Sequence, residues 1–488
     1  MEDKNQEFLL NTIKLFLANT MVFAISALSV PVVSRLYSPA DFGDAAYFMS
    51  VIGIIASISS LRYDASIVLT DSSKEARVML LASALICLLV SIIAWTAATL
   101  LHEMNPGWIA PIGKYLGIFP LAIFLSGFSQ IMISFLSRYK RFSQIGTMNT
   151  SKVVVQQLYR IALGAAGFAS ALQMILSVLM GLILSLALTA KYLRTVVNKM
   201  RADRIRLKEL RHGIRRYKNF PLYSSWTYFI NILGIQLPFL VVGKLFGIEK
   251  VGYFSAAVIL LGVPQLFSSA IGQVLYQRSV AAKSEGNLAI IVFEIYKRLI
   301  IYGIFPFGLI AIYGPELTTF VLGERWATSG RYAQLLSSVY FCIFFSSPLG
   351  HLYNILGLQR INLRFNFFRL LTQILSLMIG GLLGNIYIAL LGYSVSGSIF
   401  RYSSISWVLS RSGIDLISNV IVIIKAASLS LVPLLLIKAI ETWLQLSPGI
   451  SIVAISGAAL GYYATNLAND TLAYGVIKDR FRRLFGNT

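Results

Sequence analysis

Cysteine, histidine and acidic residues are all scarce in this 488-residue chain, and their scarcity limits the functions open to it. The two cysteines, Cys87 and Cys342, lie within apolar segments, which is typical of small buried hydrophobic residues and not of a redox pair. The three histidines, His102, His212 and His351, do not have the spacing of metal ligands. We therefore expect neither a metal site nor a cofactor.

Recognisable catalytic motifs are lacking as well. The sequence has no GxGxxG fingerprint, no P-loop and no GxSxG motif, and no nucleophile with its base suggests an active site. Only 20 Asp and Glu residues stand against 42 Lys and Arg, a net charge of +22. In a soluble protein this excess would favour nucleic-acid binding. Here most basic residues fall in short segments between apolar runs, so we predict neither an enzyme nor a nucleic-acid partner.

What the chain does have is repeated apolar runs of membrane-spanning length. Hydrophobic residues make up 57% of it and charged residues 13%, a balance that fits no soluble globular class. We predict an all-α polytopic membrane protein with about 14 transmembrane helices of about 20 residues each. Their predicted centres lie near residues 22, 51, 89, 124, 159, 181, 233, 264, 308, 344, 374, 398, 430 and 462.

The distribution of Lys and Arg predicts the orientation of these helices. Basic residues cluster at Arg138–Arg141 and Lys478–Arg483, whereas the turns Gly164–Gln173 and Gly380–Asn385 carry no charge. The positive-inside rule then places both termini in the cytoplasm, in a multi-pass protein of the cytoplasmic membrane. The N-terminal residues lack the basic region and cleavage site of a signal peptide, so we expect the first helix to be retained.

Matching residues recur in the two halves of the chain at an offset of 209 positions. They are Arg160 with Arg369, Arg35-Leu36-Tyr37 with Lys244-Leu245-Phe246, and Phe42-Gly43 with Val251-Gly252. Six helices in each half would make the halves parallel repeats, related by an axis along the membrane normal, with a site at their interface.

Four regions follow from this repeat. We predict an N-terminal lobe at 1–193, a basic linker at 194–218, a C-terminal lobe at 219–410, and two further helices with a basic tail at 411–488. The linker holds ten Lys and Arg residues, and apolar residues recur in it at helical spacing. It is therefore either an amphipathic helix bound to anionic membrane lipids or a solvated segment that enforces topology.

Two polar stripes interrupt the apolar helices, and each contains one arginine of the repeated pair. A guanidinium at mid-membrane depth costs about 2.5–3.5 kcal/mol on insertion scales. The stripes consist of Lys152, Gln156 and Arg160, with Gln157 beside them, and of Asn362, Asn366, Arg369 and Gln373. They indicate a polar cavity, although hydrogen bonds between helices are the alternative explanation. Because membrane carboxylates are nearly absent, the cavity suits an anion, and the planar fork of arginine suits phosphate.

Further charges lie near the predicted helix ends. Lys14 and Arg62 are candidates for anion capture on the cytoplasmic side, but Lys14 is equally explained by snorkelling and Arg62 by pairing with Asp64. Coupling to a proton or sodium gradient would require a titratable group near the cavity. Asp64 and Asp470 are the candidates, and Asp470 is alternatively explained by contacts with neighbouring asparagines.

Several segments together resemble the Wzx-type polysaccharide and O-antigen flippases, in the polysaccharide-transporter branch of the multidrug/oligosaccharidyl-lipid/polysaccharide exporter superfamily. They are Arg35–Gly43, Arg62–Asp64, Tyr217–Pro221, Val251–Ala257, Pro264, Ile271–Val274 and Leu322–Trp326. No single segment is specific to this family, but the order of the segments along the chain is specific to it.

The resemblance implies two six-helix lobes around a cationic cavity that opens alternately to either side of the membrane. It implies a polyprenyl-pyrophosphate-linked oligosaccharide as substrate, moved from the inner to the outer leaflet. In the related lipid II flippases two extra C-terminal helices form a groove for the lipid tail, which the last two helices here would match. One departure is that no basic residue lies between Tyr253 and Gln277, where those flippases use an arginine.

Our hypothesis from the sequence is a flippase in which Arg160 and Arg369 bind the pyrophosphate, with Lys14 and Arg62 aiding capture. The polar residues of both stripes would line the sugar cavity. A polysaccharide polymerase or glycosyltransferases are the expected protein partners. The alternatives are a drug/cation antiporter of the same superfamily, a non-transporting scaffold of a polysaccharide assembly complex, and a polymerase or ligase that acts on the same lipid.

Overall fold

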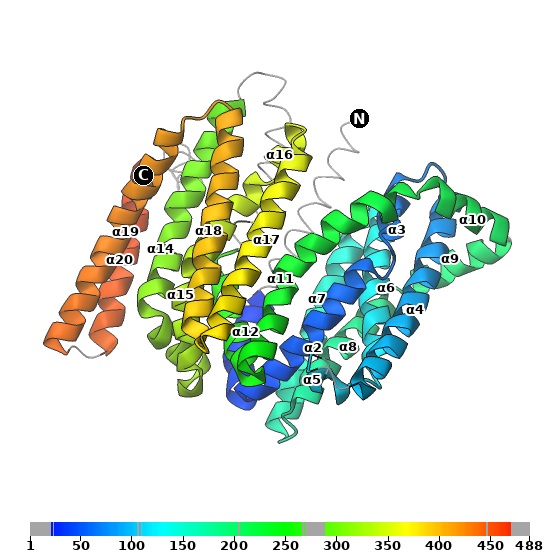
Figure 1. Ribbon diagram of the computed structural model, residues 1–488, viewed down its shortest axis with the longest axis horizontal. Helices are drawn as coiled ribbons and strands as arrows, with labels where there is room; N and C mark the ends of the chain where they lie inside the picture. Colours follow the sequence, from blue (N-terminus) through cyan, green and yellow to red (C-terminus); the bar gives the residue numbers. More distant parts are fainter. Residues whose placement is uncertain are drawn as a thin grey trace, which may run out of the picture. The chain divides into compact units, whose positions relative to one another are not determined.

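A computed structural model of the chain describes residues 21–22, 24–104, 107–108, 110–203, 205–265, 268, 288–445 and 448–469. Every regular element in these ranges is a helix (Figure 1). The longer helices are α2 (Pro39–Ile58), α4 (Ser73–Glu103), α6 (Phe119–Arg138), α7 (Phe142–Ala165), α8 (Ala171–Leu188), α9 (Ala190–Ala202), α10 (Leu207–Arg216), α11 (Ser225–Phe246), α12 (Ile248–Gly262), α14 (Leu288–Leu322), α15 (Ala327–Leu349), α17 (Gln359–Leu382), α18 (Ile386–Arg411), α19 (Leu416–Leu444) and α20 (Pro448–Asn469). Short helical turns are α3 (Tyr63–Ser66), α5 (Ala110–Gly113), α16 (Leu352–Ile355), η1 (Ile67–Leu69), η2 (Phe220–Ser224) and η3 (Glu324–Trp326).

Nine of the described helical segments are long and apolar enough to cross a membrane. The prediction of an all-α, multi-pass membrane protein is therefore confirmed, while the figure of about 14 spans stays a prediction. The number of candidate spans is lower than 14 in part because α7, which has 24 residues, is not among the nine. Its stripe of Lys152, Gln156, Gln157 and Arg160 lowers its hydropathy.

Side-chain caps explain where several helices begin. Before α2, the Ser38 hydroxyl accepts a hydrogen bond from the Asp41 amide, and the Asp41 carboxylate accepts one from the Ser38 amide. This reciprocal capping box satisfies two amides that the helix itself leaves unpaired. Ser72 before α4 and Ser170 before α8 are simpler N-caps. Each serine hydroxyl accepts a hydrogen bond from the backbone amide three residues later.

The chain groups into two compact units, which are described separately. Unit 1 contains Met1–Ile259, Thr318–Ser329 and Asn366–Tyr393, and unit 2 contains the remaining ranges, Leu260–Leu317, Gly330–Phe365 and Ser394–Thr488. The predicted division into two lobes, a linker and two added helices stays a prediction.

In unit 1, α7 packs along α8, and α2 packs on α6, α8 and α11. Phe48 of α2 is buried edge-on against Tyr115 and Phe119. In unit 2, α20 is held to α14 by aromatic residues. Tyr462 stacks on Phe305 at 5.5 Å between ring centroids, and its hydroxyl donates a hydrogen bond to the Ile301 carbonyl at 2.8 Å.

Two glycines of the sequence repeat meet each other in unit 1. α2 begins at Pro39 and α12 at Ile248, which is the repeat offset of 209 (248 minus 39). A Cβ on Gly43 would collide with the Ile248 carbonyl, and one on Gly252 would collide with the Pro39 carbonyl. In the predicted arrangement of two parallel repeats, equivalent positions would come this close only near the axis that relates the repeats. Glycine is required here because the neighbouring atoms are backbone and cannot turn aside.

We expect Gly43→Ala and Gly252→Ala each to destabilise the protein by about 1–3 kcal/mol, the usual cost of overpacking. The measurement is thermal unfolding of the protein purified in detergent. Gly461→Ala in α20 is the control, because no atom lies within 4 Å of the added methyl. Equal melting temperatures for Gly252→Ala and Gly461→Ala would contradict the close helix crossing.

Candidate functional site

The polar stripe predicted on α17 lies on its buried face. Arg369, Gln373, Leu377 and Gly380 are the buried residues of this helix, at steps of four, four and three. Asn362 and Asn366 continue the stripe, are half-buried and each already have an interaction. The large apolar residues exposed on the same helix are Leu363, Phe367, Phe368, Leu371, Leu375, Met378, Ile379 and Leu382, and Arg360 and Arg364 are exposed near its start. A polar inside and an apolar outside suit a helix in lipid that lines an interior polar space.

Arg369 is the most informative residue of this stripe. Its side chain is only 7% exposed. The Nε–H has no hydrogen-bond partner, and no carboxylate lies within ion-pairing distance of the guanidinium among the described residues. Its Nη2 lies beside Gly234 of α11, about 3.5 Å from where a Cβ would be. A buried cation without a counter-ion is costly, so this geometry favours an anion that comes from outside the protein.

Arg160 is the counterpart of Arg369 in the sequence repeat, but its guanidinium has hydrogen-bond partners. Its Nε donates to the Ser177 hydroxyl of α8 at 2.8 Å, and its Nη2 lies 3.5 Å from the Met174 carbonyl oxygen. With its amide oxygen turned toward the guanidinium, Gln156 accepts from Nη2 at 2.8 Å. All these partners are neutral. They fill the hydrogen bonds of Arg160 but leave its positive charge uncompensated.

Arg62 and Asp64 lie at a third polar place, where α2 ends and α3 begins. Arg62 Nη1 is 3.7 Å from Asp64 Oδ2, and the guanidinium lies 4.1 Å from the ring centroid of Tyr228 in α11. Asp64 is only 2% exposed and accepts a hydrogen bond from the Ser60 hydroxyl at 2.5 Å. The Ser134 hydroxyl of α6 donates a longer one, at 3.4 Å. The predicted alternative that Arg62 pairs with Asp64 is therefore realised, with Arg62 Nε still unpartnered.

A cavity of about 170 Å³ adjoins this pair, between α2, α3, α6 and α11. Besides Arg62 and Asp64, polar residues of the two longer neighbouring helices line it, including Gln130 and Gln236. Gly53 of α2 leaves room for the Gln236 amide, which lies 3.0 Å from where a Cβ would be. A cavity of this size and polarity has room for several waters or a small ion.

α11 separates this cavity from Arg369. Tyr228, Ile232 and Gln236 line the cavity at steps of four, whereas Gly234, beside Arg369, is two residues from Ile232 and from Gln236. Two residues turn a helix by about 200°, so Gly234 faces away from the cavity. The structure therefore does not bring Arg62 and Arg369 into one pocket, although both contact the same helix.

The other predicted residues are placed as follows. Gln157 is buried on α7, and Lys152 is half-buried with its carbonyl close against Gly181 of α8. Lys14 and Asp470 lie outside the described residues. Sequence reasoning missed Ser60, Ser134, Tyr228 and Gln236, because no spacing links residues of the turn after α2, of α6 and of α11.

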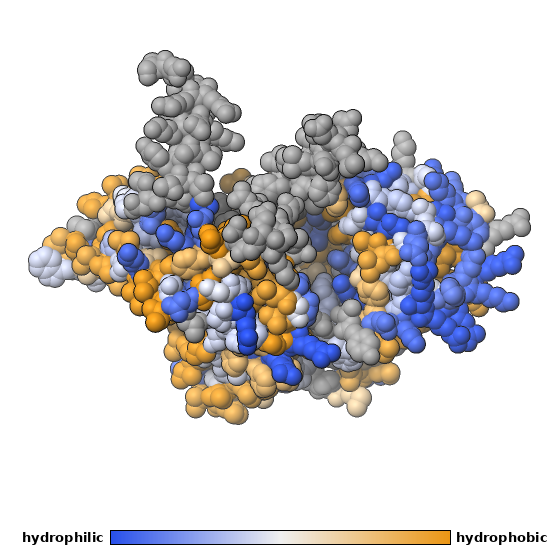
Figure 2. Space-filling view, turned by 90° about the horizontal axis from the view of Figure 1, so that it is seen from above, coloured by the Kyte–Doolittle hydropathy of each residue, from blue (hydrophilic) through white to orange (hydrophobic). Residues whose placement is uncertain are grey.

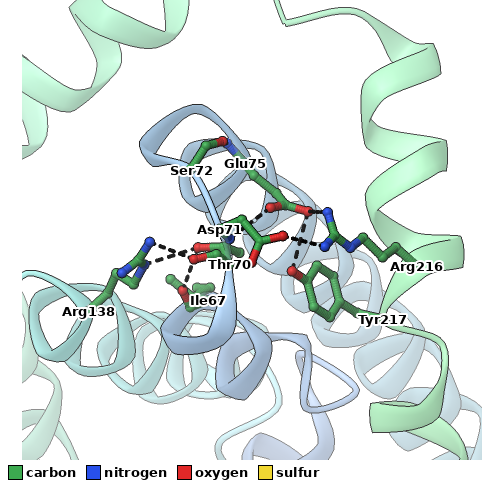
Figure 3. Close-up of polar contacts among 8 residues, drawn as sticks. All are labelled: Ile67, Thr70, Asp71, Ser72, Glu75, Arg138, Arg216 and Tyr217. Carbon is green, nitrogen blue, oxygen red and sulfur yellow. Dashed lines mark hydrogen bonds and ion pairs between the residues drawn. The ribbon is translucent and has the colours of Figure 1, made fainter.

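The basic linker forms α9 and α10, and its acidic residues tie it to the start of α4. Arg77 pairs with Asp203 at 2.5 Å, and Lys74 pairs with Glu209 at 2.6 Å. The hydrogen bond from Lys74 lowers the pKa of Glu209 below its ordinary value. Arg216 bridges Asp71 and Glu75, while Arg138 of α6 binds the Thr70 carbonyl from the other side of the same loop (Figure 3).

α10 is thus packed on α4, and the side chains of this end of unit 1 are strongly hydrophilic (Figure 2). Most linker bases, including Arg194, Lys208, Arg211 and Lys218, stay exposed. Both sequence interpretations of the linker therefore keep support: it is amphipathic, and it presents a basic surface.

Known proteins resemble this chain in sequence and in fold. A family model described as "Polysaccharide biosynthesis protein" matches residues 32–331. No curated protein matches the chain at a significant level.

Three solved structures resemble most of the chain in fold. The lipid II flippase MurJ, in an inward closed conformation, aligns with a TM-score of 0.69 at 14% identity, over 94% of this chain and 100% of its own. A multidrug resistance MATE family transporter of the MOP superfamily aligns with a TM-score of 0.60 at 14% identity, over 80% and 94%. A MOP superfamily transporter from Pyrococcus furiosus aligns with a TM-score of 0.54 at 13% identity, over 83% and 95%. The predicted superfamily fold is confirmed.

The buried pair of Arg62 and Asp64 should be energetically coupled. In a double-mutant cycle with Arg62→Gln and Asp64→Asn, we expect a coupling of about 1–3 kcal/mol, because each single change leaves a buried group unpaired. Thermal and denaturant unfolding in detergent measure it. The exposed pair of Lys74 and Glu209 is the matched control, with less than about 1 kcal/mol expected. A coupling no larger than in the control would mean that Arg62 and Asp64 do not form a functional pair.

Proposed function

Because the chain belongs to the polysaccharide biosynthesis protein family, we propose that it is a flippase for a polyprenyl-pyrophosphate-linked oligosaccharide. The cargo would be an O-antigen, capsule or exopolysaccharide repeat unit, moved from the inner to the outer leaflet of the cytoplasmic membrane. The family and the fold are those of a multi-pass transporter of polysaccharide biosynthesis and not of an enzyme.

The observation that carries this proposal is the state of Arg369. It is buried in an apolar helix with an unpartnered Nε–H and with no carboxylate in ion-pairing range among the described residues. A pyrophosphate oxygen would complete its hydrogen bonds and neutralise its charge in one contact. A carrier of organic cations needs the opposite charge at such a place.

Arg160 is the second proposed contact. Its neutral partners Gln156 and Ser177 are able to exchange for phosphate oxygens without leaving a buried ion behind. Asn366 and Gln373 on α17, and Gln157 and Lys152 on α7, offer amide and amine groups to sugar hydroxyls. In this proposal the prenyl tail stays in lipid, and α19 and α20 supply the apolar surface beside it. Much of the exposed surface of these two helices is large and apolar.

Alternating access in this proposal comes from two parallel lobes that rock about the axis between them. The contact of Gly43 with Gly252 supports such an axis, since the two residues are equivalent in the repeat and approach each other reciprocally. Both termini would lie in the cytoplasm, where a polysaccharide polymerase and glycosyltransferases would be the protein partners. The exposed bases of the linker would contact anionic lipids.

Asp64 is the proposed site of ion coupling. It is buried beside a cavity of about 170 Å³ and is held by serine hydroxyls and Arg62. Protonation of the carboxylate, or sodium binding to it, would weaken its hold on Arg62 and so change the contact of α3 with Tyr228 of α11.

We expect Arg369→Ala to lower flipping by about tenfold or more, since it removes charge-assisted hydrogen bonds to the pyrophosphate. Arg160→Ala should act in the same direction. The measurement is sugar export, or flipping in proteoliposomes, at matched expression. Arg364→Ala is the control, because Arg364 lies exposed on the same helix. Wild-type export by Arg369→Ala and Arg160→Ala would sink the site assignment.

A drug/cation antiporter remains the second candidate, because the fold also matches a MATE transporter with a TM-score of 0.60. On the flippase proposal, overexpression should leave susceptibility to cationic drugs unchanged, since among the described residues no acid pairs with Arg160 or Arg369. Drug susceptibility of cells with and without the protein tests this. Cation resistance that disappears in Asp64→Asn but persists in Arg369→Ala would favour the antiporter.

A further inference from the structure

Unit 1 contains a second, larger cavity that the proposed transport path does not use. It has a volume of about 590 Å³ and lies among α4, α6, α7, α8 and α9. This volume is within the range of small-molecule binding sites. Its walls include side chains that are almost fully buried, such as Phe135, Met148 and Val196, so it is built into the fold and is not a surface dent.

The charges in this cavity are positive. Arg77, Arg141 and Lys199 line it. Asp203 neutralises Arg77 through an ion pair. Neither Arg141 nor Lys199 has a carboxylate partner within the part of the chain that the structure describes. The cavity therefore carries about two uncompensated positive charges.

The guanidinium of Arg141 is held in a set orientation. It lies 4.4 Å above the ring centroid of Tyr192. Phe135 packs against Tyr192 at 6.2 Å and against Tyr139 at 5.1 Å between centroids. A guanidinium stacked on an aromatic face keeps its N–H edge free, and a planar edge of this kind binds phosphate oxygens bidentately.

The N-termini of two helices add to the positive electrostatic potential of this cavity. α7 begins directly after Arg141, and α4 begins at Ser73, which also lines the cavity. The positive ends of both helix dipoles thus lie at the cavity wall and favour an anion. Gln144, in the first turn of α7, has a buried Oε1 without a hydrogen-bond partner. An acceptor left unpaired next to an anion site suits a ligand that carries a hydroxyl group as well as a phosphate.

The surroundings of the cavity indicate where such a ligand comes from. Leu188 lines the cavity, is 54% exposed and is the last residue of α8, a candidate membrane span. Leu184, one turn earlier, and Val197 of α9 are also exposed. The cavity therefore reaches the surface where a span ends, at the level of lipid headgroups, with apolar side chains beside it for acyl chains.

We propose that this cavity binds the headgroup of an anionic glycerophospholipid. Arg141 and Lys199 hold the phosphate, Gln144 accepts a hydrogen bond from a headgroup hydroxyl, and the exposed leucines of α8 contact the acyl chains. Since α9 contains the start of the linker and Arg77 ties it to α4 through Asp203, a lipid in this cavity would brace the linker against α4. The proposal does not depend on which substrate the protein transports.

The test is binding of dioctanoyl phosphatidylglycerol to the full chain in a neutral detergent, measured by native mass spectrometry and by titration. We expect Arg141→Gln with Lys199→Gln to weaken binding about tenfold or more, because both phosphate contacts are lost. Lys208→Gln with Arg211→Gln is the matched control, which removes the same charge from exposed positions on α10. The control should bind like the wild type. Thermal unfolding confirms that both double variants are folded.

Competition distinguishes the sources of the phosphate. Dioctanoyl phosphatidylcholine, which has the same chains but no net negative charge and no headgroup hydroxyl, should bind more weakly than phosphatidylglycerol. Glycerol 1-phosphate should displace the lipid only at much higher concentration, because it lacks the acyl chains. The proposal is overturned if the cavity variant binds phosphatidylglycerol as the wild type does, or if the linker control loses as much affinity. Equal affinity for glycerol 1-phosphate and the lipid would assign the cavity to a soluble phosphate compound instead.

Discussion

The structure depends on how a few arginines are accommodated among apolar helices. A guanidinium withdrawn from water must have its N–H groups bonded and its charge balanced, and the two needs are separable. Arg62 obtains a counter-charge from Asp64 and lies against the ring of Tyr228, although its Nε has no hydrogen-bond partner among the described residues. Arg160 obtains neutral hydrogen-bond acceptors only. Arg369 has an unpartnered Nε and no counter-ion among the described residues. This gradation separates Arg62, which has a counter-ion, from Arg160 and Arg369, which we propose bind the anionic group of the substrate.

Helix packing in unit 1 keeps these cations apart. α11 presents Tyr228, Ile232 and Gln236 to the cavity at Arg62 and turns Gly234 toward Arg369. One helix therefore touches both places on different faces, and a change in the bond between Arg62 and Asp64 acts on the helix that borders Arg369. This would give the proposed ion binding at Asp64 a physical route to the proposed substrate site without any shared pocket.

The basic residues outside the candidate membrane spans also form ion pairs that hold the linker in place. Asp203 and Glu209 tie the linker to Arg77 and Lys74 of α4, and Arg216 adds bonds to Asp71 and Glu75. Within the described ranges, Arg141 and Lys199 have no acidic partner beside a cavity of about 590 Å³. Because the acids of this region are few, their placement decides which bases become structural and which remain available for anions. The linker is thus anchored to α4 while most of its basic side chains stay exposed.

The sequence by itself determined the class of the protein, the polar stripe on α17 and the repeat that includes Gly43 and Gly252. Helical periodicity and the cost of charge in lipid are local properties, so Arg369 and Gln373 were predictable as residues of one buried face. Only the tertiary structure decided that Arg62 forms an ion pair with Asp64, that Arg160 donates a hydrogen bond to Ser177, and that α11 lies between Arg62 and Arg369. It also created the cavity at Arg141. Apart from the pair of Arg62 and Asp64, these features join residues of different helices, and no periodicity within one helix encodes which neighbour it meets.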